Sequence, residues 1–336
     1  MSAVTAIKEK LPNLPSLGWF GGLMKREFID HKIGFFWAPL FLAALMAIGI
    51  LWGVSFGDAQ IGNWDLDDIH ISSDRGIVVD HMEYGIDKLN EMDLRSLRRA
   101  LGLAMLALSF PILMIIPFVV GFGLLNCLYD DRKDRSYLFW KSMPVSDTKE
   151  VLSKLFAISV VGPAIIILIA AVVQVFAQIV GGIYLSVQGV EGIWSFIWSN
   201  VPTVDLAFGM IANIIVLNIW ALPIIGWFLL VSSWAPRVPW LLAPAAIGVT
   251  TAFEAMFNQS TYFIEWVARR LSGWAFQMND DYDVEAYGIS SHNEGPFFMD
   301  AWDKLAAGFS SGEFWASTAL GVGLIAGAIY FRRHRM

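Results

Sequence analysis

Six long apolar stretches constrain the fold of this chain more than any other feature of its sequence. They cover residues 33–55, 101–128, 151–186, 207–233, 239–258 and 313–331. An α-helix needs roughly 20 apolar residues to cross the hydrocarbon core of a bilayer, and each stretch is about that long or longer. Only 16% of the residues are charged, whereas about a quarter are charged in a soluble domain. The sequence therefore predicts an all-α integral membrane protein with six transmembrane helices.

The distribution of Lys and Arg predicts how these helices are oriented. The N-terminal segment, residues 129–154, residues 234–238 and the C-terminal segment together hold 15 Lys and Arg against 8 Asp and Glu, whereas the rest of the chain holds 8 against 22. Basic loops remain on the cytoplasmic side of a membrane. We therefore expect a multi-pass protein of the bacterial cytoplasmic (inner) membrane, with both termini inside and two sizeable outer loops, residues 56–100 and 259–312.

The N-terminal segment, residues 1–32, differs in composition from the six-helix domain expected over residues 33–336. Residues 1–16 are polar, whereas residues 17–32 mix aromatic and aliphatic side chains with Lys25, Arg26 and Lys32. Such a segment can form an amphipathic helix in the plane of the membrane interface. An ordinary basic flank of the first span explains the same pattern equally well.

The cytoplasmic loop over residues 129–150 mixes charge with aromatic side chains. Aromatic residues in its middle are Tyr137, Phe139 and Trp140. Aromatic anchors surrounded by charge are typical of surfaces that dock another protein. The alternative is that Phe139 and Trp140 lie in the lipid interface, where Trp is common.

The same loop carries signals for a helix stop and restart. Pro144 cannot continue a helix, and Asp147 with Glu150 three residues later reads as an N-cap with a variant capping box. We therefore predict a short helix over residues 134–143, a stop at Pro144, and a new helix capped by Asp147.

Two stretches of the chain are similar to a known family. The run DRKDRS at 131–136, followed by LFWKSMPVSD at 138–147, resembles the cytoplasmic coupling loop of ABC-2 type transporter permeases. MKREF at 24–28, followed by WAPL at 37–40, supports the resemblance. It implies the permease subunit of an exporter that moves a substrate using ATP hydrolysed by a separate subunit. The residues expected to couple the two subunits are Asp130, Asp131, Arg132, Lys133, Asp134, Arg135, Tyr137, Phe139, Trp140, Lys141 and Pro144.

The resemblance also implies partners: two copies of an ABC ATPase subunit, which would bind ATP and Mg, and a second permease subunit, expected to be identical. We expect membrane lipid and no nucleic acid as further contacts. The chain has no phosphate-binding loop of the form G-x-x-x-x-G-K-[ST], no paired catalytic set within the spans and no metal-ligand spacing of its five histidines. We therefore expect no enzyme activity, cofactor or metal in this chain. An ATP-independent secondary transporter or a membrane scaffold is the alternative.

A few polar residues within the spans are candidates for a substrate path, because polar groups in lipid are costly. They are Gln174, Gln178, Asn213 and Glu254. Hydrogen bonding between helices explains the amides at least as well, and Glu254 lies near the outer end of its span, where it could reach water. Glycines at fourfold spacing favour close helix packing, either within the subunit or in a dimer. These are Gly49, Gly53, Gly57, Gly323 and Gly327.

Overall fold

The computed structural model describes residues 17–55, 94–141, 146–187, 192–272, 276–278, 284–286, 309 and 312–335. Within these ranges, six helical segments are long and apolar enough to cross a membrane by length and composition. They are Ile33–Ser55, Leu101–Lys133, Asp147–Val187, Ile193–Trp220, Pro239–Asn258 and Gly312–His334. The prediction of a multi-pass α-helical membrane protein is confirmed at this level. Most of the two predicted outer loops lies outside the described residues, as does Gly57.

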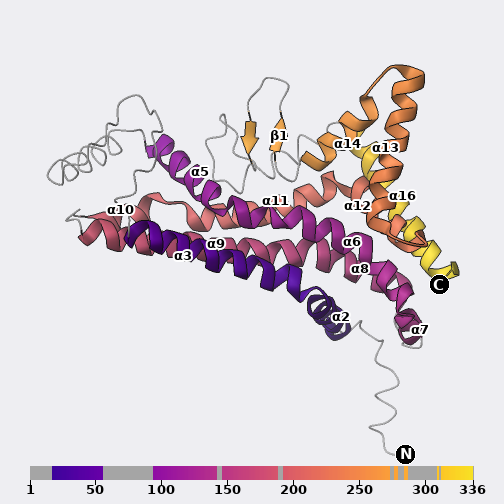
Figure 1. Cartoon of the computed structure of the whole chain (residues 1–336), viewed down its shortest axis with the longest axis horizontal. Helices are drawn as coiled ribbons and strands as arrows, with labels where there is room; N and C mark the ends of the chain where they lie inside the picture. Colours follow the sequence, from indigo (N-terminus) through magenta and orange to yellow (C-terminus); the bar gives the residue numbers. More distant parts are fainter. Residues whose placement is uncertain are drawn as a thin grey trace, which may run out of the picture.

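The helices of the first half of the chain include long ones that lie side by side and an N-terminal one that is seen nearly end-on (Figure 1). They are α2 (Leu17–Asp30), a π-helical turn η1 (Ile33–Trp37) that leads into α3 (Ala38–Ser55), α5 (Leu94–Leu113), α6 (Ile115–Lys133) and the short α7 (Ser136–Lys141). The next segment comprises α8 (Asp147–Phe156), a second π-helical turn η2 (Ala157–Val161) and α9 (Gly162–Val187). The long α9 packs against α3, α5 and α11, so it forms the centre of the bundle.

The second half contains α10 (Ile193–Asn200), α11 (Thr203–Trp220), α12 (Leu222–Trp234), α13 (Pro239–Asn258), α14 (Tyr262–Ser272) and α16 (Gly312–Arg335). Two short antiparallel strands, β1 (Phe276–Met278) and β2 (Val284–Ala286), form a hairpin that the sequence did not predict. In Figure 1, α13 and α14 extend away from the long helices, and α16 returns beside α12.

One predicted span is wrong. The stretch 207–233 was expected to be one helix, but the chain breaks at Ala221, between α11 and α12. Pro223 lies at the start of α12. Proline has no amide hydrogen and cannot complete the helical ladder to the preceding turn. The crossing that includes α11 therefore ends at Trp220, and α12 is a separate, shorter apolar helix.

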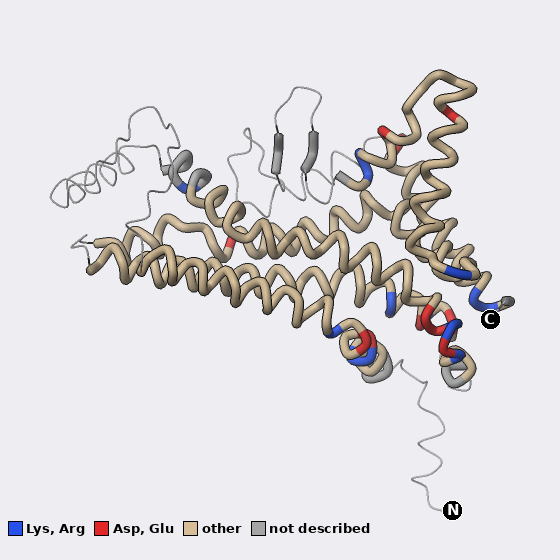
Figure 2. Tube along the Cα trace, in the orientation of Figure 1, with Lys and Arg blue, Asp and Glu red and all other residues tan. Residues whose placement is uncertain are grey.

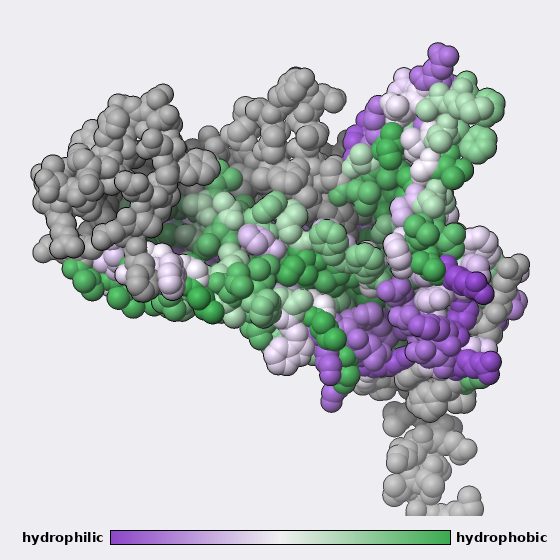
Figure 3. Space-filling model, in the orientation of Figure 1, coloured by the Kyte–Doolittle hydropathy of each residue, from purple (hydrophilic) through white to green (hydrophobic). Residues whose placement is uncertain are grey.

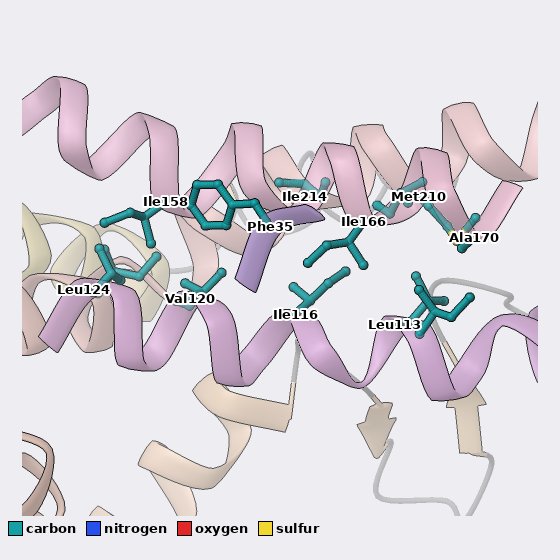
Figure 4. Packing of buried hydrophobic residues seen from close by; sticks show 14 of the residues in the cluster. Phe35, Leu113, Ile116, Val120, Leu124, Ile158, Ile166, Ala170, Met210 and Ile214 are labelled. Atoms are coloured by element: carbon teal, nitrogen blue, oxygen red, sulfur yellow. The ribbon is translucent and has the colours of Figure 1, made fainter. Parts of the chain in front are cut away.

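The core lies where α3, α6, α9 and α11 meet, and it is made of aliphatic side chains around one ring. Phe35, from η1, is buried among Ile116, Val120 and Ile166 (Figure 4). A Cβ atom at Gly162 would come within 2.7 Å of the Phe35 ring, which is closer than van der Waals contact allows. Gly162 therefore lets α9 approach η1 closely enough to enclose the ring.

Charged residues gather at one end of the bundle (Figure 2), where α2, α7 and the end of α16 lie. Figure 3 shows the same end as a hydrophilic surface, next to the apolar flanks of the long helices. Large side chains on these flanks are exposed, among them Phe41, Ile48 and Leu168. Such flanks suit contact with lipid. We call the hydrophilic part the charged end.

Candidate functional site

The charged end contains a cluster of ionisable side chains that are largely removed from solvent. Among the described residues, three cations and three carboxylates meet there from four different helices. They are Arg26 and Glu27 of α2, Asp131 of α6, Glu150 and Lys154 of α8, and Arg332 of α16. All except Arg26 are buried. We call these six residues the ionic cluster.

Asp131 is the centre of the ionic cluster, because cations from three helices approach its carboxylate. Its oxygens lie 3.3 Å from Arg26, 3.3 Å from Lys154 and 3.1 Å from Arg332. Charged side chains are almost never fully buried unless they are paired. The three contacts therefore explain how an aspartate at the end of a membrane helix can lie inside the protein.

Glu150 and Glu27 complete the balance of charge. The Glu150 carboxylate is 2.6 Å from Arg332 and 3.8 Å from Arg26, and Glu27 is 3.2 Å from Lys154. Burial raises the pKa of the Glu27 carboxyl above its usual range, and Lys154 and Arg26 only partly oppose that shift. At Glu27, desolvation therefore has a larger effect on the pKa of the carboxyl than the two neighbouring cations have.

Local sequence explains why these residues converge. Glu150 and Lys154 are four apart and lie on one face of α8, and Arg26 and Glu27 lie on the face of α2 that packs against α8 and η2. The buried face of α2 thus contains Glu27 as well as Leu23. Both readings of residues 17–32 placed this segment at a membrane surface and neither predicted a buried carboxylate.

Asp131 and Arg132, adjacent in sequence, fix two different parts of the bundle. The Arg132 guanidinium donates hydrogen bonds to the main-chain oxygens of Ser232, Ser233 and Ala235 at the end of α12. The last carbonyls of a helix lack partners within it, so Arg132 caps α12. Two residues of the predicted docking surface are therefore engaged inside the subunit, which leaves the residues that follow them as candidates for contact with a partner.

Those following residues are accessible. Lys133, Asp134 and Arg135 are exposed, as is Asp130, and Tyr137 is half-buried. Arg135 has a φ of 54°, a left-handed conformation that separates α6 from α7. The short helix is Ser136–Lys141; it begins two residues later than the predicted 134–143, and residues 142 and 143 lie outside the described residues. The side chains of Phe139, Trp140 and Lys141, and all of Pro144, lie outside the described residues.

The restart of the helix differs from the prediction by one residue. Ser146, not Asp147, is the N-cap of α8: it has an extended backbone, and its hydroxyl accepts a hydrogen bond from the Lys149 amide at 3.4 Å. Asp147 is the first helical residue and lies 3.8 Å from Arg332. Serine and aspartate are both good caps, so sequence preference alone could not choose between them.

The amides proposed for a substrate path lie between helices. Gln174 donates to the Ser109 hydroxyl at 2.7 Å and to the Met105 carbonyl at 3.2 Å, and Gln178 donates to the Thr203 hydroxyl. Asn213 is buried in α11. The two glutamines therefore join α9 to α5 and α11, as the alternative of hydrogen bonding between helices predicts.

Glu254 caps the neighbouring helix. Its carboxylate accepts hydrogen bonds from the Ser260 hydroxyl and from the Phe263 amide, each at 2.9 Å. Phe263 is the second residue of α14, where amides lack partners within the helix and negative charge is favourable. Glu254 and the ionic cluster lie in different parts of the structure, since α13 and α14 extend away from the long helices (Figure 1).

Some of the predicted packing glycines face open space, and others that were not predicted are tightly packed. A Cβ atom at Gly49, Gly53 or Gly323 would meet nothing within 4 Å, whereas one at Gly327 would lie 3.3 Å from Leu230. The closest approach of α12 and α16 is at Gly321, where a Cβ atom would lie 2.7 Å from the Leu222 carbonyl carbon.

Sequence reasoning identified Asp131 as a site residue but not the other five members of the ionic cluster: Arg26, Glu27, Glu150, Lys154 and Arg332. The available signal was the position of these charges at the ends of apolar helices, since charge there must be paired or reach water.

The comparisons with known proteins add no identification: no family model, curated protein or solved structure matches this chain.

Proposed function

We propose that this chain is the membrane-spanning permease subunit of an ABC-2 type exporter, working with a separate ATPase subunit. The observation that carries the proposal is the contact between the two stretches that resemble the family. Arg26 of the N-terminal stretch and Asp131 of the loop stretch are 105 positions apart in sequence, yet their side chains lie 3.3 Å apart. A coupling loop would need such a contact, because a movement of the loop must be transmitted to the membrane-spanning helices.

The ionic cluster supplies the path for that motion. A push on α7 acts on the end of α6, to which α7 is connected by only two residues. From there Asp131 connects to α2, α8 and α16, and Arg132 connects to α12. Buried ionic contacts resist separation, because leaving a charge unpaired in a desolvated site is costly. In this proposal, a movement of α7 therefore shifts the inner ends of these helices together.

In this proposal the charged end faces the cytoplasm, where the ATPase binds ATP and Mg. Exposed Lys133, Asp134 and Arg135 set the orientation and encounter rate of the partner, and Phe139 and Trp140 anchor it. A second copy of the chain completes the path. The bond-making chemistry remains with the ATPase.

The test is the double variant Phe139→Ala, Trp140→Ala, co-expressed with a candidate ABC ATPase subunit that co-purifies with the wild-type chain. Truncating buried interface anchors typically costs about 2 kcal/mol or more, roughly thirtyfold in affinity. We expect the variant to insert normally and to lose the ATPase during purification. The matched control is Phe36→Ala, Trp37→Ala, which removes two adjacent exposed aromatic side chains from η1. Full co-purification of the ATPase with the loop variant, or equal loss in both variants, would contradict the docking role.

A further inference from the structure

An open apolar cleft lies between two walls of the bundle and begins close to the ionic cluster. Its volume is about 360 Å³. One wall comes from α8 and η2, with Leu152, Phe156 and Val160, and the other from α11 and α12, with Asn218, Ile219 and Leu222. Leu152 and Phe156 leave 44% and 45% of their surfaces exposed. The cleft is therefore open to whatever surrounds the helices.

Both walls deviate from regular helix at the cleft. Val160 lies in the π-helical turn Ala157–Val161, and Ile219 and Leu222 flank the break at Ala221. Such π-helical turns are rare and are frequently found at functional sites. The Asn218 amide nitrogen connects the two irregular segments, because it donates to the Ser159 carbonyl across the cleft at 2.8 Å and to the Ile214 carbonyl at 2.8 Å.

The chemistry of the lining selects hydrocarbon over water. A bound water needs two to four polar partners. The cleft is lined almost wholly by aliphatic and aromatic groups, and both hydrogens of the Asn218 amide are already used. The Asn218 Oδ1 is the remaining side-chain amide acceptor. A flexible apolar chain fits this lining, whereas an ordered water cluster does not.

Charge at the entrance favours an anionic headgroup. Lys149 is exposed and precedes Leu152 by three residues in α8, so the two side chains share a face of the helix. Basic side chains near the ends of membrane helices attract anionic lipid headgroups. We propose that the cleft binds one acyl chain of an anionic membrane amphiphile, with its headgroup at the level of Lys149. As a statement about the exported substrate, it rests on the function proposed above.

The test uses a phosphatidylglycerol analogue with a photoreactive acyl chain, incorporated into phosphatidylcholine vesicles that contain the purified protein. We expect saturable labelling of about one site per chain, mapped by mass spectrometry to α8–η2 and α11–α12. Val160→Trp, which fills the cleft, should reduce labelling of these segments at least tenfold. The control Leu168→Trp, on an exposed face of α9 outside the cleft, should label like the wild-type chain. Lys149→Gln should reduce the preference for phosphatidylglycerol about fivefold, which corresponds to about 1 kcal/mol for one basic residue.

Labelling spread evenly over all exposed helix faces, or unchanged by Val160→Trp, would show ordinary surrounding lipid and overturn the site. This assay requires neither transport nor an ATPase, so its failure leaves the proposed function standing. Conversely, the cleft could be labelled as expected in a chain that binds no ATPase. That result would refute the export function and leave the lipid site supported. In the assembled complex, phosphatidylglycerol should stimulate ATP hydrolysis in Leu168→Trp and not in Val160→Trp. Equal stimulation in both variants would show that the cleft is not the binding site of the exported substrate.

Discussion

Replacing Arg332 by methionine should strongly destabilise the protein, since this residue joins α16 to two buried carboxylates. Methionine keeps much of the apolar stem of arginine and removes the charge. Arg332 is 2% exposed and lies 2.6 Å from Glu150 and 3.1 Å from Asp131. In the variant, Asp131 retains Arg26 and Lys154, both at 3.3 Å. Among the described residues, Glu150 retains Arg26 as its one ion-pair partner, at 3.8 Å, so it is the group that loses most.

The expected cost follows from the charge left behind. Removing one partner of a buried ion pair typically costs about 3–5 kcal/mol, because the other charge stays desolvated. Replacing both partners by neutral side chains is often close to energetically neutral. We therefore expect Arg332→Met to lose about 3–5 kcal/mol of unfolding free energy. We expect the double variant Arg332→Met, Glu150→Gln to recover most of that loss.

Reversible unfolding in mixed detergent micelles, followed by circular dichroism, measures these differences. Arg333→Met is the matched control, because Arg333 is the next residue of α16 and is exposed. An exposed substitution of this kind usually changes stability by no more than about 0.5 kcal/mol. If Arg332→Met cost no more than Arg333→Met, or if the double variant were less stable than Arg332→Met, the ionic cluster would not be the contact between helices described above.

Three further predictions concern the packing and the caps. Gly321→Ala should destabilise the protein by about 1–3 kcal/mol, because its new methyl group meets the backbone of α12. Gly323→Ala should be neutral or slightly stabilising. Equal thermal stability of the two variants would refute the close approach of α12 and α16. Glu254→Gln should lower the unfolding free energy by about 0.5–1 kcal/mol, because α14 loses a charged cap, and it should not affect the transport proposed above. Reduced transport at unchanged stability would instead support the substrate-path prediction for Glu254. Ser146→Ala should cost about 1 kcal/mol, and an unchanged unfolding curve would show that another group caps α8.

The helices could be predicted from the sequence because their signal is local. A run of apolar residues long enough to span a bilayer depends on few distant contacts, so the ends of the first and fifth spans were placed correctly at residues 33–55 and 239–258. The prediction of the fourth span was wrong for a local reason as well, because Pro223 lies within a run that is otherwise apolar and does not stand out by hydropathy. A turn one residue wide between two apolar helices leaves hydropathy almost unchanged.

The ionic cluster could not be predicted in the same way, because its members are joined only in space. A sequence shows that Asp131 follows an apolar helix, but not that Arg332, 201 positions later, ends beside it. Arg26, Lys154 and Arg332 belong to the positive charge that predicts the orientation of the helices, and they are also partners of buried carboxylates. The loop resemblance predicts a coupling role at the surface for Asp131, and the structure shows this residue buried in the ionic cluster.

The membership of the ionic cluster has a consequence for biosynthesis. Arg332 lies in α16, which the ribosome makes after all the other described helices. Until α16 enters the membrane, Asp131 and Glu150 must wait without their closest cation. We therefore expect these carboxylates to stay hydrated at the charged end until α16 is made. The arrival of α16 would then supply the missing cation and complete the ionic cluster.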